Sequence, residues 1–211
     1  MTAAQESAPD VSYPDAPWRM HGQLWLSIFR TSRAVDELRP AGTWGVAFVR
    51  YEDPSPLTYG ELLVARPVKS PVKAVTISDI WVDSPASVAG GRELWAIPKD
   101  LCNFTWRDHG GRVARTEVAA DIDGQPVCSA SFADVSSLAP RVPFKGATWQ
   151  PELAEGIGAG RGEKTASLTG SSKALPARAT WSFNREGALG WLADARQVAS
   201  VRMSDFRMNF G

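Results

Sequence analysis

The sequence has little of what several common kinds of site require. It contains two cysteines, Cys102 and Cys128, and two histidines, His21 and His109, and it has no Cys-x-x-Cys spacing. Two cysteines make no disulfide framework, and two histidines far apart in sequence do not predict a metal site. We therefore expect reduced cysteines and no metal.

The charge balance lacks an excess of either sign. Lysine plus arginine equals aspartate plus glutamate at 23 each, so the formal net charge is zero. Nucleic-acid binding needs a basic face, so we expect no nucleic-acid partner. No run of about 18 or more apolar residues is present, so we expect no membrane span. The first ten residues have neither the basic start nor the apolar core of a secretion signal, which predicts a cytoplasmic protein.

Alternating apolar and polar residues are abundant and predict strands. Between residues 23 and 29, Leu24, Leu26 and Ile28 point one way, while Gln23, Trp25, Ser27 and Phe29 point the other. Asp123-Gly124 is a strong hairpin signal between two further strands. The predicted strands cover residues 23–30, 44–51, 58–68, 72–82, 112–120, 125–133, 177–184 and 198–210.

Helical signals are few. Ser84 followed by Pro85 is typical of a helix N-cap and first helical position, and Pro98 predicts the end of that helix. A second helix is expected near residues 188–197, and the Gly-, Ser- and Ala-rich residues 155–173 predict a long mobile loop. The expected class is α+β, with a disordered tail at 1–12 and a single domain at 13–211.

Residues 90–102, GGRELWAIPKDLC, are the most informative segment. Lys99 follows a short apolar run, and burial of an ammonium group lowers its pKa and frees the amine to attack carbonyl groups. Gly90 and Gly91 each cost about 1 kcal/mol relative to alanine inside a helix, so a close approach of another backbone or of a ligand is expected there.

This segment resembles the active-site motif of the acetoacetate decarboxylase family. Two further segments, PWRMHGQ at 17–23 and YGE at 59–61, resemble family segments and occur in the family order. The resemblance covers roughly residues 13–105 and implies antiparallel strands closed into a barrel or cone around a pocket, with one or two short helices. It also implies a lysine Schiff base, formed by Lys99 without a cofactor.

Some family positions are kept and others are changed. The resemblance makes Glu61 the acid/base partner of Lys99, with Tyr59 on the same strand face. Gln23 stands where the decarboxylases carry an arginine that holds the substrate carboxylate, and no carboxylate occurs near Val46, where a second family glutamate is expected. Acetoacetate would lose its anchor, so the expected substrate is a larger, less charged carbonyl compound.

Asp100 occupies the position of a second family lysine. If it faces the site it raises the pKa of Lys99, and if it faces away, as strand neighbours of an inward residue do, it has no such effect. Trp25 and Trp95 are expected to pack against the substrate, although a core role for the nine tryptophans is equally compatible with the sequence. Arg92 is a further candidate contact, with a structural ion pair favoured, and His21 is expected to be structural.

Two functions follow from the resemblance. The first is a Schiff-base lyase that acts on a keto compound by decarboxylation or by aldol condensation and dehydration. The alternative is a non-covalent ligand-binding or cyclase-like pathway protein that retains the fold. Residues 158–165, GAGRGEKT, nearly form a phosphate-binding loop, but Glu163 replaces the required glycine, so nucleotide binding is rejected. We expect a homo-oligomer that binds a small carbonyl compound.

Overall fold

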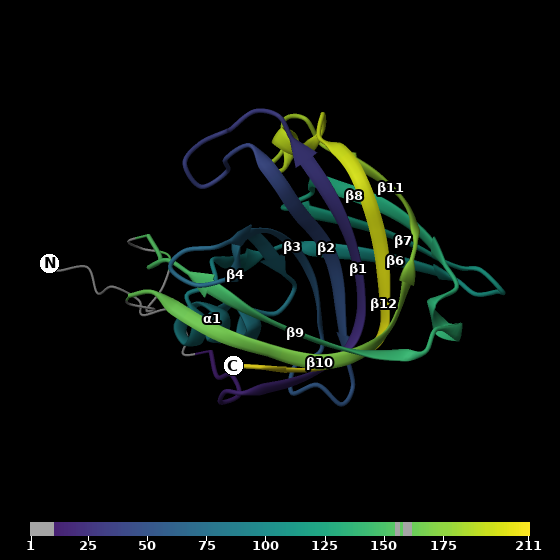
Figure 1. The fold of residues 1–211 in the computed structure, drawn as a ribbon, viewed down its shortest axis with the longest axis horizontal. Helices are drawn as coiled ribbons and strands as arrows, with labels where there is room; N and C mark the ends of the chain where they lie inside the picture. Colours follow the sequence, from purple (N-terminus) through teal and green to yellow (C-terminus); the bar gives the residue numbers. More distant parts are fainter. Residues whose placement is uncertain (1–10, 155–156, 158–161) are drawn as a thin grey trace, which may run out of the picture.

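The computed structural model describes residues 11–154, 157 and 162–211, and within them the chain is built mainly from strands (Figure 1). One α-helix, α1 (Pro85–Trp95), and two short 3-10 helices, Ser136–Leu138 and Gly190–Leu192, interrupt them. The strands are β1 (Trp18–Thr31), β2 (Gly42–Glu52), β3 (Tyr59–Val68), β4 (Ala74–Val82), β5 (Lys99–Leu101), β6 (Asn103–His109), β7 (Ala114–Ile122), β8 (Gln125–Asp134), β9 (Arg141–Gln150), β10 (Lys164–Pro176), β11 (Arg178–Phe183) and β12 (Arg196–Phe210).

Seven strands close into a barrel. Their order is β3-β2-β1-β12-β10-β9-β4, and β4 pairs back with β3 to complete the ring. All pairs in the ring are antiparallel except β4–β9, which is parallel and rests on one residue pair, Val75 with Thr148. The short strand β5 adds to β4 beside this contact, also in parallel, and pairs Lys99 with Ile80. The predicted α+β class and barrel architecture are confirmed.

A second sheet covers one side of the barrel. It has the order β11-β8-β7-β6 and lies beside β1 and β12 in Figure 1. Strand alternation places the odd-numbered aromatic residues of β1, Trp25 and Phe29, in the core between the two sheets. The even-numbered Leu24 and Leu26 point into the barrel. Six of the nine tryptophans belong to or pack against the core between the sheets: Trp25, Trp44, Trp81, Trp106, Trp181 and Trp191.

Helix α1 closes one end of the barrel, where it packs against β4, β5 and β10. Ser84 caps it as predicted, because its hydroxyl accepts a hydrogen bond from the backbone N–H of Ser87. The helix ends at Trp95, and Ala96 takes the left-handed conformation (φ 51°) with its N–H bonded to the carbonyl of Arg92. Trp95 then packs edge-on against Trp18 and Phe210 at the barrel floor.

Most of the predicted strands are confirmed, and two local predictions are wrong. Residues 164–173 belong to strand β10 and not to a loop, because they pair on both sides, with β9 and with β12. Residues 188–197 form only the 3-10 turn Gly190–Leu192 before β12 begins at Arg196. The tail residues 1–10 and residues 158–161 of the glycine-rich segment lie outside the described residues.

Candidate functional site

The barrel encloses a cavity of about 530 Å³. Apolar side chains from all seven barrel strands make up most of its wall, and α1 and the residues after it form its floor. A small set of polar side chains gathers at that floor. The wall includes Leu24, Leu26, Ala47, Val49, Leu63, Ile77, Phe144, Leu168, Met203, Phe206 and Met208, and the floor Trp18, Met20, Trp95, Ile97, Tyr51, Tyr59, Glu61 and Lys99.

Lys99 is held at the floor by the end of α1. The αL turn at Ala96 and the missing N–H of Pro98 stop the helix, and β5 begins with the Lys99 side chain pointing inward. Gly91 leaves room for it, since a Cβ there would lie 2.7 Å from Lys99 Cδ. The glycine pair is therefore explained by approaching side chains, Lys99 at Gly91 and Trp18 at Gly90, and not by a backbone.

The Lys99 amine has three polar contacts. Its Nζ donates to Glu61 Oε2 at 2.9 Å, to Ser87 Oγ at 2.9 Å and to Tyr59 Oη at 3.2 Å. The second Glu61 oxygen accepts a hydrogen bond from the Tyr51 hydroxyl at 3.0 Å. Lys99 is 4% exposed and Glu61 3% exposed, so this is a buried ion pair with hydrogen bonds on both partners.

The sequence led us to expect that burial alone determines the pKa of Lys99, and the structure shows that neighbouring groups determine it as well. Burial lowers the pKa of Lys99, but the Glu61 carboxylate and Tyr59 beside it outweigh burial and raise that pKa above its ordinary value. The expectation of a depressed pKa for Lys99 is therefore wrong. Burial and the Glu61 charge also raise the pKa of Tyr51 well above 10, so its hydroxyl stays a donor.

Chemically, the floor combines a primary amine with a carboxylate in direct contact. Transfer of one proton from Lys99 to Glu61 would give a neutral amine and a neutral acid in direct contact. A neutral amine is a nucleophile toward carbonyl carbon, and the resulting acid can return the proton. The arrangement requires no bound cofactor for these steps.

Four of the residues singled out in the sequence meet at this cavity: Tyr59, Glu61, Trp95 and Lys99. Tyr59 and Glu61 lie on the same face of β3, as the alternation predicts. Trp95 forms part of the floor, although its ring also packs on Trp18 and Phe210.

Gln23 and Trp25 do not line this cavity. They lie on the opposite face of β1, because the residues that point inward are Leu24 and Leu26. The Gln23 amide donates to Glu52 and accepts from Arg202, and the Arg202 guanidinium lies 3.6 Å from the centre of the Trp25 ring. Trp25 therefore belongs to the core between the two sheets and Gln23 to polar contacts with Glu52 and Arg202, so neither side chain is part of the cavity site.

The structure places Arg92 and Asp100 outside the cavity as well. Arg92 Nε donates to the backbone carbonyl of Lys99 at 2.7 Å, which fixes the start of β5. Asp100 points outward with its side chain 71% exposed and 3.8 Å from Arg92, so it faces away from Lys99. His21 does not line the cavity. Its backbone N–H donates a hydrogen bond to the hydroxyl of Ser55, in the connection that follows β2.

Two polar residues of the floor were missed in the sequence. Ser87 precedes Gly91 by four residues on α1 and so shares its face, which is the signal that could have identified it. Tyr51 lies opposite Tyr59 in the β2–β3 hairpin. Pairing the two predicted strands outward from the turn between them would have placed Tyr51 beside the site.

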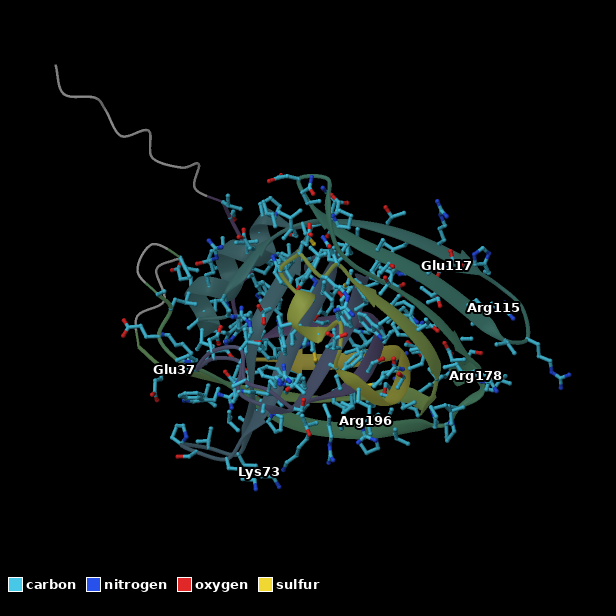
Figure 2. All side chains as sticks on the ribbon, turned by 90° about the horizontal axis from the view of Figure 1, so that it is seen from above. Glu37, Lys73, Arg115, Glu117, Arg178 and Arg196 are labelled. Atoms are coloured by element: carbon cyan, nitrogen blue, oxygen red, sulfur yellow. The ribbon has the colours of Figure 1, made fainter. Side chains whose placement is uncertain are left out.

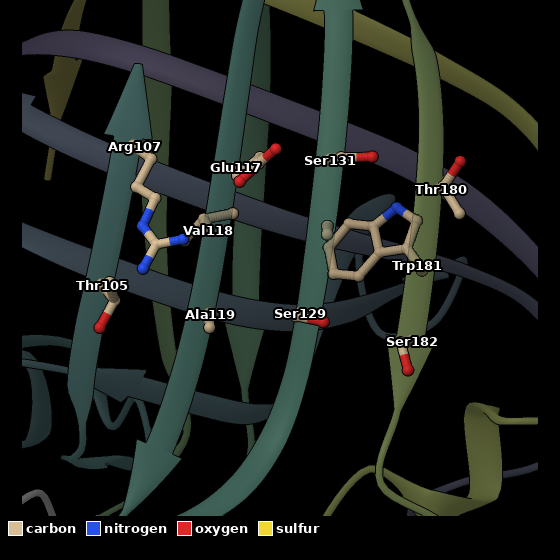
Figure 3. A pocket seen from close by; sticks show the side chains of 11 residues that line it. Thr105, Arg107, Glu117, Val118, Ala119, Ser129, Ser131, Thr180, Trp181 and Ser182 are labelled. Atoms are coloured by element: carbon tan, nitrogen blue, oxygen red, sulfur yellow. The ribbon is translucent and has the colours of Figure 1, made fainter. Parts of the chain in front are cut away.

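A second hollow, of about 430 Å³, lies on the outer face of the covering sheet (Figure 3). Most of its side chains are small, apart from Trp181, and Arg107 on β6 lies opposite Glu117 on β7 in the strand register. It has no buried amine or carboxylate, so it offers none of the chemistry of the barrel floor. Among the described residues no group of three His, Cys, Asp or Glu side chains could hold a metal ion. No helix in the described part of the chain is long and apolar enough to cross a membrane.

The same fold occurs in solved structures with little sequence in common. Acetoacetate decarboxylase from Legionella pneumophila subsp. pneumophila str. Philadelphia 1 has a TM-score of 0.65 at 14% identity, over 99% of this chain and 90% of its own. The enduracididine biosynthesis enzyme MppR, complexed with the condensation product of pyruvate and imidazole 4-carboxaldehyde, has a TM-score of 0.63 at 17% identity, over 95% and 88%. An acetoacetate decarboxylase-like enzyme from Sphingomonas wittichii RW1 has 0.62 at 14% identity, over 99% and 96%.

At these identities the likeness shows the shared fold. No curated protein matches the sequence. The family model for acetoacetate decarboxylase matches residues 35–145, which is more than half of the chain and includes Tyr59, Glu61, Ser87 and Lys99. The chain therefore belongs to the acetoacetate decarboxylase family.

Proposed function

We propose that this protein is a lysine-imine lyase that acts on a carbonyl compound by decarboxylation or by aldol condensation and dehydration. The observation that carries the proposal is the Lys99 amine, buried at the floor of an apolar cavity with a carboxylate 2.9 Å away. Of the sequence candidates, Lys99 and Glu61 act on the substrate, and Tyr59 and Trp95 shape the floor around it.

In the proposed reaction Glu61 takes a proton from Lys99, and the neutral amine attacks the carbonyl carbon. The carbonyl oxygen leaves as water, and a protonated carbon–nitrogen double bond remains. That bond accepts the electron pair released at the neighbouring carbon, whether by loss of CO₂ or by loss of a proton before attack on an aldehyde. After loss of CO₂ the enamine carbon takes up a proton, which Glu61 can donate, whereas after attack on an aldehyde the new hydroxyl group leaves as water. Hydrolysis of the remaining imine releases the product and returns the free lysine.

Acetoacetate is a poor match for this floor. Among the described residues the basic side chain at the floor is Lys99, which is bound to Glu61. Arg66 lies five residues further along β3 than Glu61 and on the other strand face, and Lys145 lies on the outer face of β9. A carboxylate beside the imine carbon would meet Glu61 and no second cation. Charge-assisted hydrogen bonds are worth roughly 1.5 to 3 kcal/mol, so their absence costs a small keto acid about one to two orders of magnitude.

Borohydride trapping tests the proposal. Wild-type protein mixed with a methyl ketone and borohydride should gain the mass of the reduced ketone adduct on one residue. Lys99→Met should gain none, and Lys164→Met, a lysine outside the cavity lining, should behave as the wild type. Adduct formation on Lys99→Met to the wild-type extent would refute the proposal.

A second function, ligand binding without covalent chemistry, is favoured by one observation. The Glu61 carboxylate raises the pKa of Lys99 and so favours the protonated, non-nucleophilic form of the amine. Calorimetry distinguishes the two functions. A ketone that binds in the cavity but gives no trapped adduct between neutral and alkaline pH would support binding alone.

A further inference from the structure

The cavity wall above the floor is almost entirely apolar. Along β3, Leu63 and Ala65 follow Glu61 on the inward face. Among the described lining residues above the floor, the polar side chains that point inward are those of Thr43 and Thr148, and both are uncharged. Alternation turns the neighbouring basic side chains of β3 and β9 to the outside of the barrel. A ligand that extends up from the floor therefore contacts hydrocarbon along most of its length.

Charged side chains lie instead on the outer surface. Glu37, Lys73 and Arg178 are exposed, and Figure 2 shows them projecting from different sides of the molecule. The charges at the floor, on Lys99 and Glu61, are paired with each other at 2.9 Å. A carboxylate or phosphate on the body of a ligand would be buried against the apolar wall without a partner, which is costly.

The open end of the cavity lies far from the amine. Val49 and Glu61 face each other near the floor and are buried, whereas Thr43 and Pro67, at the far ends of the same stretches of β2 and β3, are exposed. Six residues of β3 separate Glu61 from Pro67. With a rise of about 3.3 Å per residue and a strand tilt of about 40°, the depth is roughly 15 Å. An extended chain advances roughly 3.5 Å for every three bonds, so about a dozen bonds span this depth.

Small residues widen the cavity along β2 and β3. Ala47 is the inward residue of β2 that follows Val49 toward the open end, and Gly45 and Ala65 lie opposite each other one step further. A Cβ added at Gly45 would lie 3.2 Å from Leu26 Cδ1, another atom of the wall. Larger side chains at these three positions would project into the cavity, so they leave a passage from the open end to the floor.

Flexible side chains face this passage. The methionines in the described part of the chain are Met20, Met203 and Met208, and all three line the cavity. Methionine is unbranched and adapts its shape to what it contacts. Recognition of a compact polar molecule needs several fixed hydrogen-bonding groups, which this wall does not supply. It suits a flexible aliphatic chain.

Building on the proposed imine chemistry, we propose that the substrate is an uncharged aliphatic carbonyl compound with a chain of about ten to twelve carbon atoms. Its carbonyl group lies beside Lys99, and the chain extends along β2 and β3 to the open end. The carbonyl group is at or next to the end of the chain, because Trp18 and Trp95 close the floor behind it. Ala47 and Ala65 then determine how long a chain the cavity accepts.

A series of methyl ketones from acetone to 2-tridecanone tests the substrate class. The concentration that half-saturates borohydride trapping should fall about threefold to fourfold for each added CH₂ group. It should stop falling at a chain of about ten to twelve carbon atoms, where the chain reaches the open end. Half-saturation that does not depend on chain length would overturn the substrate class, while adduct formation would still support the lyase.

A charged probe of matched length tests the apolar wall. 4-Oxopentanoate has the same five-carbon chain as 2-pentanone but carries a carboxylate at its far end, which would lie against the wall. It should need at least a tenfold higher concentration for half-saturation, because its charge is buried without a partner. Equal half-saturation for the two probes would overturn the requirement for an uncharged body.

Size variants at two depths test the path of the chain. Ala47→Leu should shorten the longest chain that still gains affinity by more carbon atoms than Ala65→Leu, because Ala47 lies one step nearer the floor. Ala147→Leu, on the outward face of β9 and outside the lining, is the matched control and should leave the series unchanged. Ala65→Leu decides alone if Ala47→Leu does not fold. An unchanged series in Ala65→Leu would overturn the proposed path.

Binding without Lys99 separates this inference from the proposed function. In the double variant Lys99→Met/Glu61→Gln, which leaves no unpaired charge at the floor, calorimetry with the same ketones should show the same gain for each CH₂ group. If the wild type forms no adduct with any ketone but this gain persists, the lyase proposal fails and the ligand class stands. If the double variant binds short and long ketones equally, the ligand class fails.

Discussion

At the scale of single residues, the state of Lys99 depends on two opposed effects. Burial disfavours its charge, and Glu61 favours it more strongly. One oxygen of the Glu61 carboxylate accepts a hydrogen bond from Lys99, and the other accepts one from Tyr51. The Glu61 carboxylate is therefore held in place from both of its oxygens. The amine becomes reactive only when its proton moves to Glu61 or to solvent.

Glu61→Gln should therefore shift the pH profile of imine trapping to lower pH. Removing the carboxylate leaves burial as the main influence, and burial lowers the pKa of Lys99. The rate of adduct formation, measured against pH by mass spectrometry, should reach its plateau at least one pH unit earlier than in the wild type. Asp100→Asn is the control and should not move the profile, because Asp100 faces outward. An unmoved profile for Glu61→Gln would contradict this account of Lys99.

The same groups predict a loss of stability at alkaline pH. The folded protein raises the pKa of both Lys99 and Tyr51, so each contributes stability that is fully present below its unfolded pKa, near 10. That stability is lost as the pH rises through the folded values. The free energy of unfolding from urea titrations should fall between about pH 9 and pH 11, and less steeply in Tyr51→Phe. The same slope in both proteins would contradict the prediction for Tyr51.

At the scale of elements, the contact between α1 and β5 positions the amine. Gly91→Ala raises helix propensity by about 1 kcal/mol but brings a methyl group within 2.7 Å of Lys99 Cδ. Since three hydrogen bonds hold Nζ in place, the side chain can shift only by losing some of them.

We expect Gly91→Ala to reduce the rate of adduct trapping at least tenfold with an unchanged circular dichroism spectrum. Gly146→Ala on β9, where an added Cβ meets nothing within 4 Å, is the matched control and should trap as the wild type does. A wild-type rate in Gly91→Ala would mean that the close approach of helix and lysine has no influence on reactivity.

The side chain of Gln150 adds hydrogen bonds to the β4–β9 junction. Gln150 is 1% exposed; its Oε1 accepts from the backbone N–H of Ile77 and its Nε2 donates to the Ile77 carbonyl. Gln150→Leu leaves both backbone groups buried without partners, at about 1 to 3 kcal/mol each. Urea denaturation should show a loss of about 2 to 4 kcal/mol. A loss below about 1 kcal/mol would mean that water replaces the amide at this junction.

The elements that could be predicted from sequence are those with strong local signals. Strands with apolar alternation, the capped helix and the Asp123-Gly124 hairpin needed no tertiary information. Strands β6, β9 and β10 were missed because charged, glycine and serine residues there weaken local strand preference, and pairing with neighbouring strands decides their structure.

The candidate site was predicted in part for the same reason. The motif around Lys99 and the part of Glu61 were identified by resemblance to family segments, and the shared face of Tyr59 and Glu61 follows from strand alternation, so neither required tertiary information. The alternation on β1 correctly separated Gln23 and Trp25 from Leu24 and Leu26, but the sequence does not tell which face is inside the barrel. That choice depends on the covering sheet, which buries the Trp25 face instead.

At the scale of the whole molecule, two hydrophobic cores share the same strands. Each of β1, β2 and β3 contributes one face to the barrel interior and the other to the core beneath the covering sheet. Neither core can therefore lose its packing without disturbing the other. This is the physical basis for the single domain predicted at residues 13–211.

Thermal unfolding should accordingly be one cooperative transition. Far-ultraviolet circular dichroism, which follows the strands, and tryptophan fluorescence, dominated by the core between the sheets, should give the same midpoint. Two separated midpoints would contradict a single domain. Light scattering in the same buffer checks the predicted homo-oligomer, and a mass equal to one chain would contradict it.

The position of β12 in the ring has a consequence for biosynthesis. This strand lies between β1 and β10 and supplies Met203, Phe206, Met208 and Phe210 to the cavity wall. While a ribosome still holds residues 196–210, the nascent chain has all the floor residues but one wall of the cavity is missing. Its apolar interior then faces water. Chaperones that recognise exposed apolar strands could therefore bind this chain until β12 is released and closes the ring.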